Sequence, residues 1–395
     1  MEIESLKSMF VKYYGEGSVR AFCGPARVNL IGEHTDHQGG YVLPAAISLR
    51  SMCLLRERDD GIIRLRASDI DTTVEAHISD LSKYKTIGWG AYQIGVAYVM
   101  QQKGYSVTGM DVLFDETVPH GSGLSSSAAI EVAMATAIAT LSHEKISTPV
   151  DYVEIALIAQ EAENQYVGMN CGIMDQFASS MGQKDSAIFL RCSDLIYRYV
   201  PVRFDQYGYR LVLCNTKKPR SLIESAYNQR RKECDEAYKS LEKALDIKCL
   251  ADVTPQQFED NKSIIANPVA LKRARHVVYE NARTISACEL LERDDLVAFG
   301  RLMNESHESL RKDFEVTGIE LDAMVDACKS QEGVIGARMT GAGFGGCAIA
   351  LVETRHSDAL IANAGEIYRK KTGYSPEFYY ADITDGAGER RIEST

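Results

Sequence analysis

The sequence predicts a two-domain protein in which strands and helices are mixed. At 395 residues the chain is too long for one ordinary hydrophobic core. Strand-like and helical spacings of apolar residues also follow one another along the chain, with no repeat and no low-complexity linker. A change in composition near residues 201–208 marks the expected boundary. We therefore expect one domain over residues 1–205 and a second over residues 206–395.

The first half is expected to begin with a helix over residues 1–15, where Ile3, Leu6 and Phe10 recur at helical spacing. The further elements expected in this half are strands at 28–31, 41–47 and 51–56, a helix at 89–101, a strand at 110–114, a helix at 128–141 within the mostly helical segment 124–182, and strands at 187–190 and 197–200.

The second half is expected to open with a strand over residues 210–215 and to continue through long helices. Asn267 is a suitable N-cap and Pro268 fits a first helical turn, so one helix should begin there. Another is expected over about residues 294–314.

Charge and composition exclude several classes of protein. The net charge of −11, with no basic cluster, argues against nucleic acid as a partner. No apolar run approaches the length of a membrane span, and the N-terminal helix, which carries Glu2 and Glu4 and is amphipathic, is unlike a signal peptide. Ten cysteines are scattered without a C-x-x-C pair, so neither a zinc cluster nor a disulfide framework is indicated. We expect a cytoplasmic protein, since the cytosol keeps thiols reduced.

Residues 119–130, Pro-His-Gly-Ser-Gly-Leu-Ser-Ser-Ser-Ala-Ala-Ile, form a glycine-rich turn between a strand and a helix. Such a junction presents backbone N–H groups and a helix dipole to an anion, which favours a phosphate site. The hydroxyls of the three consecutive serines, residues 125–127, add donors, and one could ligate Mg²⁺. A Walker A loop is excluded because Gly-Lys occurs nowhere, and Ser126 replaces the third glycine of a dinucleotide fingerprint. The alternative is a turn and a small-residue helix packed in the core.

A second polar run, over residues 27–40, lies between two apolar strands. Glu33, His34 and Asp36 supply acceptors and donors suited to the hydroxyls of a polyol. A metal site is the competing interpretation, because His34 and His37 flank two acids. For residues 37–40 themselves, a plain turn is favoured.

A third run, over residues 161–176, contains two glycines that should end one helix and let another begin. Asp175 then lies in the first turn of the second helix, where the dipole and a nearby arginine would keep it ionised. Without a ligand, it would be an ordinary first-turn acid. Residues 339–347 contain G-x-G-x-x-G, but a strand follows them where a dinucleotide-binding fold requires a helix. They therefore predict a glycine turn between two strands. Its backbone N–H groups could lie near a triphosphate, or the turn could be a tight hairpin without a ligand.

Taken together, these runs resemble the GHMP kinase superfamily, and within it the galactokinases. The resemblance rests on three motifs in order at residues 24–36, 119–129 and 340–347, and on secondary marks at 172–176, 225–231 and 303–310. It implies a two-domain α+β fold, with a mixed-sheet N-terminal domain, a ferredoxin-like C-terminal domain and the active site in the cleft between them. Such proteins are often monomers, so we expect a monomer.

The resemblance also implies a reaction, in which the γ-phosphoryl group of ATP moves to the anomeric C1 hydroxyl of galactose with Mg²⁺ as cofactor. Asp175 is the implied catalytic acid/base, and Arg27 is the cation beside it. The implied sugar-binding residues are Glu33, His34, Asp36, Gly172 and Tyr227. For the nucleotide, the resemblance implies Trp89 near the adenine and, around the phosphates, Gly121, Ser122, Gly123, Leu124, Ser125, Ser126, Ser127 and Ala128. The implied metal ligands are Ser127 and Glu163.

The chain departs from the family pattern at Ala26, where glycine is usual, and at His37, where tyrosine is usual. The change at His37 also resembles galacturonokinases. Glu33 would repel a carboxylate at C6 of the sugar, which favours galactose. An N-acetylgalactosamine kinase stays open, because a small shift can make room at C2. So does a galactose and ATP sensor without turnover, although the intact serine run, Arg27 and Asp175 favour an enzyme.

Overall fold

The computed structural model describes residues 1–119, 121–146, 148–219 and 223–392, and the strands within them form three sheets. The largest has the order β13-β1-β3-β6-β4-β5, and its neighbours are antiparallel except for β4 and β6. Its strands are β1 (Arg20–Asn29), β3 (Pro44–Arg58), β4 (Ile62–Ala67), β5 (Ile70–His77), β6 (Gly109–Glu116) and β13 (Gly388–Arg390). This is the mixed sheet that the resemblance implies.

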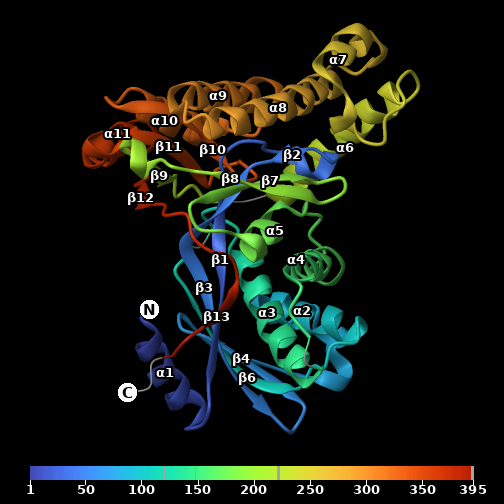
Figure 1. Ribbon diagram of the computed structural model, residues 1–395, viewed down its shortest axis with the longest axis vertical. Helices are drawn as coiled ribbons and strands as arrows, with labels where there is room; N and C mark the ends of the chain where they lie inside the picture. Colours follow the sequence, from blue (N-terminus) through green and yellow to red (C-terminus); the bar gives the residue numbers. More distant parts are fainter. Residues whose placement is uncertain (120, 147, 220–222, 393–395) are drawn as a thin grey trace.

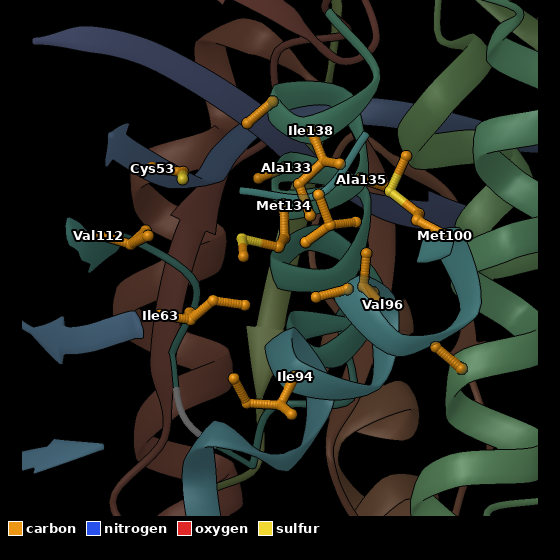
Figure 2. Close-up of a cluster of buried hydrophobic side chains, with 14 of the residues drawn as sticks. Cys53, Ile63, Ile94, Val96, Met100, Val112, Ala133, Met134, Ala135 and Ile138 are labelled. Atoms are coloured by element: carbon orange, nitrogen blue, oxygen red, sulfur yellow. The ribbon is translucent and has the colours of Figure 1, made fainter. Parts of the chain in front are cut away.

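Helices cover both faces of this sheet, with α1 on one side and α2, α3 and α4 on the other (Figure 1). The α-helices of the first half are α1 (Ile3–Tyr14), α2 (Ala91–Gln102), α3 (Ser126–Ile146), α4 (Tyr152–Glu161) and α5 (Met174–Met181). Alternate residues of β1 point to opposite faces: Ala21 and Cys23 pack with α1, whereas Phe22 packs with the α2 and α3 side. Figure 2 shows Ile63 and Val112 of the sheet facing side chains of these two helices.

The second half contains a four-stranded antiparallel sheet of order β10-β11-β9-β12. Its strands are β9 (Tyr209–Asn215), β10 (Val334–Thr340), β11 (Cys347–Glu353) and β12 (Glu377–Tyr380). The helices of this half are α6 (Ile223–Leu241), α7 (Pro255–Asn261), α8 (Pro268–Glu292), α9 (Leu296–Ser309), α10 (Gly318–Lys329) and α11 (Ser357–Thr372). Helices separate β9 from β10, and α11 separates β11 from β12, which gives the β-α-β-β-α-β order of a ferredoxin-like domain.

A small third sheet and several short helices complete the described chain. The sheet contains β2 (Tyr41–Val42), β7 (Ser186–Arg191) and β8 (Ile196–Pro201). The short helices are η1 (Asp36–Gln38), η2 (Ile78–Tyr84), η3 (Gly88–Gly90), η4 (Ala162–Val167), η5 (Asp205–Tyr207), η6 (Leu250–Asp252), η7 (Lys262–Ile264), η8 (Leu310–Phe314) and η9 (Thr354–His356). Of these, η4 and η8 are π-helical and continue α4 and α9.

The α+β fold class predicted from the sequence is confirmed, as are most of its elements. Asn267 caps α8 by accepting a hydrogen bond from the Val269 N–H at 2.9 Å, with Pro268 in the first turn. The separate strands expected at 41–47 and 51–56 were wrong, because β3 continues through residues 48–51. It does so because Arg50 and Ser51 are paired with β1, and Ser51 is paired with β6 as well.

Several helix limits also differ from the predicted ones. The helix expected from residue 294 begins at Leu296, because Asp295 caps it by accepting the Ala298 N–H at 3.0 Å. The α-helix expected from residue 89 begins at Ala91, after a 3-10 turn.

The predicted boundary near residue 205 stays a prediction. One hydrophobic cluster contains Val28 from the first half and Leu213 and Ile349 from the second. The C-terminal segment also returns to the first half, where β13 pairs with β1 (Figure 1). Among the helices described here, none has the length and apolar character needed to cross a membrane.

Candidate active site

A cavity of about 950 Å³ lies where the three predicted motifs meet. The polar run at 27–40, the glycine-rich turn at 119–130 and the hairpin at 339–347 all contribute to its wall. The predicted site residues that line it are Arg27, Glu33, His34, Asp36, Gly121, Ser122, Gly123, Ser125, Ser126, Ser127, Glu163, Gly172, Asp175 and Tyr227. Residues far apart in sequence are thus brought to one place.

An ion pair between Arg27 and Asp175 lies in the wall of the cavity. Arg27 is 3% exposed on β1, at a bulge in its pairing with β3, and Asp175 lies in the first turn of α5. The guanidinium donates from Nε to Oδ1 at 2.8 Å and from Nη2 to Oδ2 at 2.9 Å. Its third nitrogen, Nη1, donates to the Gly123 carbonyl at 3.1 Å. One arginine therefore fixes the carboxylate by a bidentate, charge-assisted pair and the backbone of the glycine-rich turn by a third hydrogen bond.

The three consecutive serines of the glycine-rich turn, residues 125–127, each hydrogen bond to a different carboxylate. Ser125, whose φ of 63° is left-handed, donates to Asp175, and Ser126 donates to the Glu116 carboxylate at 2.6 Å. Ser127 hydrogen bonds to Glu163. Their hydroxyls were expected to donate to phosphate oxygens, but carboxylates from other elements accept them in this structure.

The loop still offers features that suit a phosphate group. Helix α3 begins at Ser126, two residues earlier than expected, and the positive end of its dipole faces the cavity. The buried Ser122 hydroxyl lines the cavity and has no hydrogen-bond partner in the described part of the chain. Gly341 of the hairpin packs closely here, since a Cβ on it would lie 2.7 Å from the Gly123 carbonyl. His120 lies outside the described residues.

Three of the residues implied for the nucleotide do not line the cavity. Leu124 and Ala128 are buried in the core. Trp89 packs against the N-terminal core and donates its indole N–H to the Thr72 hydroxyl at 3.1 Å. Tyr92, three residues later, does line the cavity.

Glu33, one of the residues implied for sugar binding, is almost fully buried. Its Oε1 accepts hydrogen bonds from the Gly341 N–H at 2.8 Å and from Arg338 Nη1 at 3.3 Å. Burial raises the pKa of Glu33, and the Arg338 charge opposes that rise. The neighbouring His34 has a pKa lowered to about 3 by burial, so its neutral ring donates from Nε2 to the Ala342 carbonyl at 3.2 Å.

Asp36 and Gly172 lie in direct contact. A Cβ on Gly172 would lie 1.8 Å from Asp36 Oδ2, so only glycine leaves room for that carboxylate. Burial, and then the charge of Asp175, raise the pKa of Asp36 to about 6.

Tyr227 packs against His34 and His37 at distances between ring centroids of 5.7 and 5.6 Å. Burial raises the pKa of Tyr227, so the tyrosine keeps its hydroxyl proton. A turn is present at residues 37–40, formed by η1 and the left-handed Gly39 at its end, and the prediction that it has no functional role stays a prediction.

Glu163 and Ser127 are the pair implied for a metal ion. Glu163 is 6% exposed and also accepts a hydrogen bond from Gln176 Nε2 at 2.6 Å. Burial and the charge of Asp175 raise its pKa, while the Ser127 hydroxyl lowers it. Within the described ranges, no group of three or more His, Cys, Asp or Glu side chains could hold a metal ion. A carboxylate and a hydroxyl nevertheless fit Mg²⁺, which takes few protein ligands when phosphates and water supply the others.

The sequence reasoning missed further residues of the site. The additional lining residues include Tyr92, Met169, Asn170, Cys171, Ser225, Asn228 and Ala342. Most lie within runs already singled out, next to the residues chosen. Arg338 was missed as well, although a charged residue inside an otherwise apolar strand was a visible irregularity.

Comparisons with known proteins agree with this geometry. Family models for the GHMP kinases N terminal domain, the galactokinase galactose-binding signature and the GHMP kinases C terminal match residues 91–183, 8–57 and 287–370. The galactokinase of Bacillus subtilis is 43% identical over 394 residues, which are 99% of this chain and 100% of that protein. That of Clostridium tetani is 46% identical over 389 residues, 98% of each. The chain belongs to the galactokinase family.

Solved structures support the same assignment. A crystal structure of Lactococcus lactis galactokinase complexed with galactose matches with a TM-score of 0.93 and 38% identity, over 98% of this chain and 100% of that one. A mevalonate kinase matches with a TM-score of 0.63 and 18% identity, which shows the shared fold alone. The predicted superfamily, the galactokinase family and the class of enzyme are therefore confirmed.

Proposed function

We propose that this galactokinase-family enzyme transfers the γ-phosphoryl group of ATP to the C1 hydroxyl of galactose, giving galactose 1-phosphate and ADP. The observation that carries the proposal is the bidentate Arg27–Asp175 pair. The pair lines one cavity together with the glycine-rich turn at 119–130, which is the proposed phosphate loop, and the acceptor-rich turn at 33–36.

In the proposed mechanism, Asp175 accepts the proton of the C1 hydroxyl while the hydroxyl oxygen bonds to the γ-phosphorus and the bond to the β-phosphate oxygen breaks. Arg27 holds the carboxylate by two hydrogen bonds and neutralises charge on the phosphoryl group. Glu33, His34 and Asp36, with Gly172 and Tyr227, orient the sugar. Phosphoryl transfer has a loose transition state, so positioning and charge neutralisation contribute more than proton removal.

On the nucleotide side, Gly121–Ala128 would cradle the phosphates, through backbone groups at Leu124 and Ala128. Trp89 remains the proposed adenine neighbour, and Tyr92 is the aromatic residue that lines the cavity. Ser127 and Glu163 would hold Mg²⁺, which when bound neutralises charge on the β- and γ-phosphates. We expect Glu163→Ala to weaken Mg²⁺-dependent nucleotide binding in calorimetry, without weakening binding measured in the absence of the metal. An unchanged metal dependence would remove Glu163 from this role.

Galactose is the favoured sugar because a uronate would place its C6 carboxylate close to the buried Glu33 carboxylate. Repulsion between two like charges in a poorly solvated pocket would make binding of the uronate unfavourable. ADP release should be measured with galactose, galactosamine, N-acetylgalactosamine and galacturonate, and the product should be examined by NMR for phosphorylation at C1. We expect the highest kcat/KM with galactose. Binding of galactose and ATP without turnover would instead identify a sensor, and a preference for galacturonate would refute the sugar assignment.

The proposal includes a cytoplasmic monomer. Nothing beyond one chain is needed to line the cavity described above, since both sugar and phosphate motifs come from the same copy. Light scattering of the purified protein would test the monomer, and fractionation of cells would test the location.

A further inference from the structure

The backbone of the sugar-binding turn is held from outside the cavity by helix α8. The N–H groups of Gly32 and Glu33 donate to one carboxylate oxygen, Oε1 of Glu280, at 3.0 and 3.3 Å. The Glu33 carbonyl accepts a hydrogen bond from Nε2 of His276 at 3.0 Å. Both α8 side chains are fully buried, and neither lines the cavity.

This turn requires such support because of its backbone conformation. His34 has a φ of 60°, which lies in the left-handed region that a residue with a side chain rarely adopts. Conformations of this kind persist when the surrounding structure fixes them. The hydrogen bonds that Glu280 accepts and His276 donates fix the peptide groups immediately before His34, and the His34 ring itself hydrogen bonds to the Ala342 carbonyl.

Glu280 also reaches the Glu33 side chain by a second route, through Arg338. This arginine is fully buried; its Nη2 lies 3.8 Å from Glu280, and its Nη1 donates to Glu33 at 3.3 Å. Ser306 bridges the same groups, since it donates to Glu280 at 2.5 Å and accepts from Arg338 Nε at 3.2 Å. Although burial acts to raise it, nearby positive charge, first that of Arg283, lowers the pKa of Glu280 to about 2.

We propose that Glu280 is a positioning residue for sugar binding, which acts through the 32–34 backbone and through Arg338 without touching the sugar. The inference rests on the proposed function, because it takes Glu33 and His34 to be sugar contacts. It separates two properties of the enzyme: loss of Glu280 should impair the sugar side of the cavity much more than the nucleotide side, whose loop belongs to other elements.

The test compares Glu280→Ala and Glu280→Gln with Val277→Ala, a control in the same helix whose side chain is buried in the hydrophobic core. Galactose binding is measured by calorimetry without nucleotide, and KM values for galactose and ATP by ADP release. We expect Glu280→Ala to weaken galactose binding about tenfold or more, the scale of a small misplacement of binding groups, with the KM for ATP changed less than about threefold. Glu280→Gln keeps an acceptor but no charge, so its loss should be intermediate.

Val277→Ala should lower the thermal unfolding midpoint without changing the ratio of the two KM values. If Glu280→Ala does not fold, Glu280→Gln decides alone. The positioning role is overturned if a folded Glu280 variant binds galactose as the wild type does, or if it loses galactose and ATP affinity by the same factor. Failure of the wild type to phosphorylate galactose would instead refute the proposed function.

Discussion

Removing either member of the Arg27–Asp175 pair should slow turnover by about 10³-fold. The pair contains two charge-assisted hydrogen bonds, at 2.8 and 2.9 Å, with Arg27 only 3% exposed. Hydrogen bonds to charged groups contribute about 1.5–3 kcal/mol each, so the two together amount to about 3–6 kcal/mol. About 4 kcal/mol of lost transition-state stabilisation corresponds to about 10³ in rate. The variants are Arg27→Ala, Asp175→Asn and the double substitution.

Because the two side chains act as one unit, their effects should not multiply. The double variant is expected to be about 10³- to 10⁴-fold slower than the wild type, and not about 10⁶-fold slower. The assay is steady-state ADP release at saturating ATP and galactose. Arg20→Ala, which removes an ion pair with Glu144 and Glu389 on the protein surface, is the control and should leave kcat unchanged. Near-normal turnover in either single variant, or multiplicative losses in the double variant, would refute the reasoning.

Three further changes test other parts of the molecule. Gly172→Ala should raise the KM for galactose about tenfold or more, with a smaller change for ATP, because its Cβ would displace the Asp36 carboxylate; equal changes in both KM values would contradict this. Since the pKa of Asp36 is about 6, its carboxyl is neutral below that pH and loses an acceptor, so kcat/KM for galactose should fall as pH drops through about 6, and Asp36→Asn should lack that decline. Ile138→Ala, in the core drawn in Figure 2, should reduce the free energy of unfolding in urea by about 2–5 kcal/mol while KM values stay unchanged; a smaller loss would mean that the core closes around the gap.

Much of the site was predictable because its residues lie in short, unusual runs. Where a helix ends at a glycine, and where an acid lies in the first turn of the next helix, is determined by residues close together in the sequence. The position of Asp175 at the start of α5 could therefore be derived from spacing. Its pairing with Arg27, 148 residues away, depends on tertiary structure, and only the family resemblance suggested it.

The remainder depends on contacts that no local pattern encodes. Ser125, Ser126 and Ser127 were expected to donate to a ligand, but acids contributed by α5, β6 and η4 accept their hydrogen bonds. Arg338 and Glu33 are separated by 305 residues, and nothing in either neighbourhood indicates the other. The continuous strand β3 was likewise set by its two neighbours in the sheet and not by its own residues.

The position of β13 has a consequence for how the protein is made. Residues 388–390 complete the sheet beside Ala21, Phe22 and Cys23, although they leave the ribosome after all the other strands of that sheet (Figure 1). Until then, the outer side of β1 presents unpaired N–H and C=O groups to the cell, a surface that invites association with other nascent chains. A fragment that ends near residue 205 would retain this open edge permanently. Such a fragment should aggregate when expressed alone, and supplying the missing C-terminal segment in trans should reduce that aggregation.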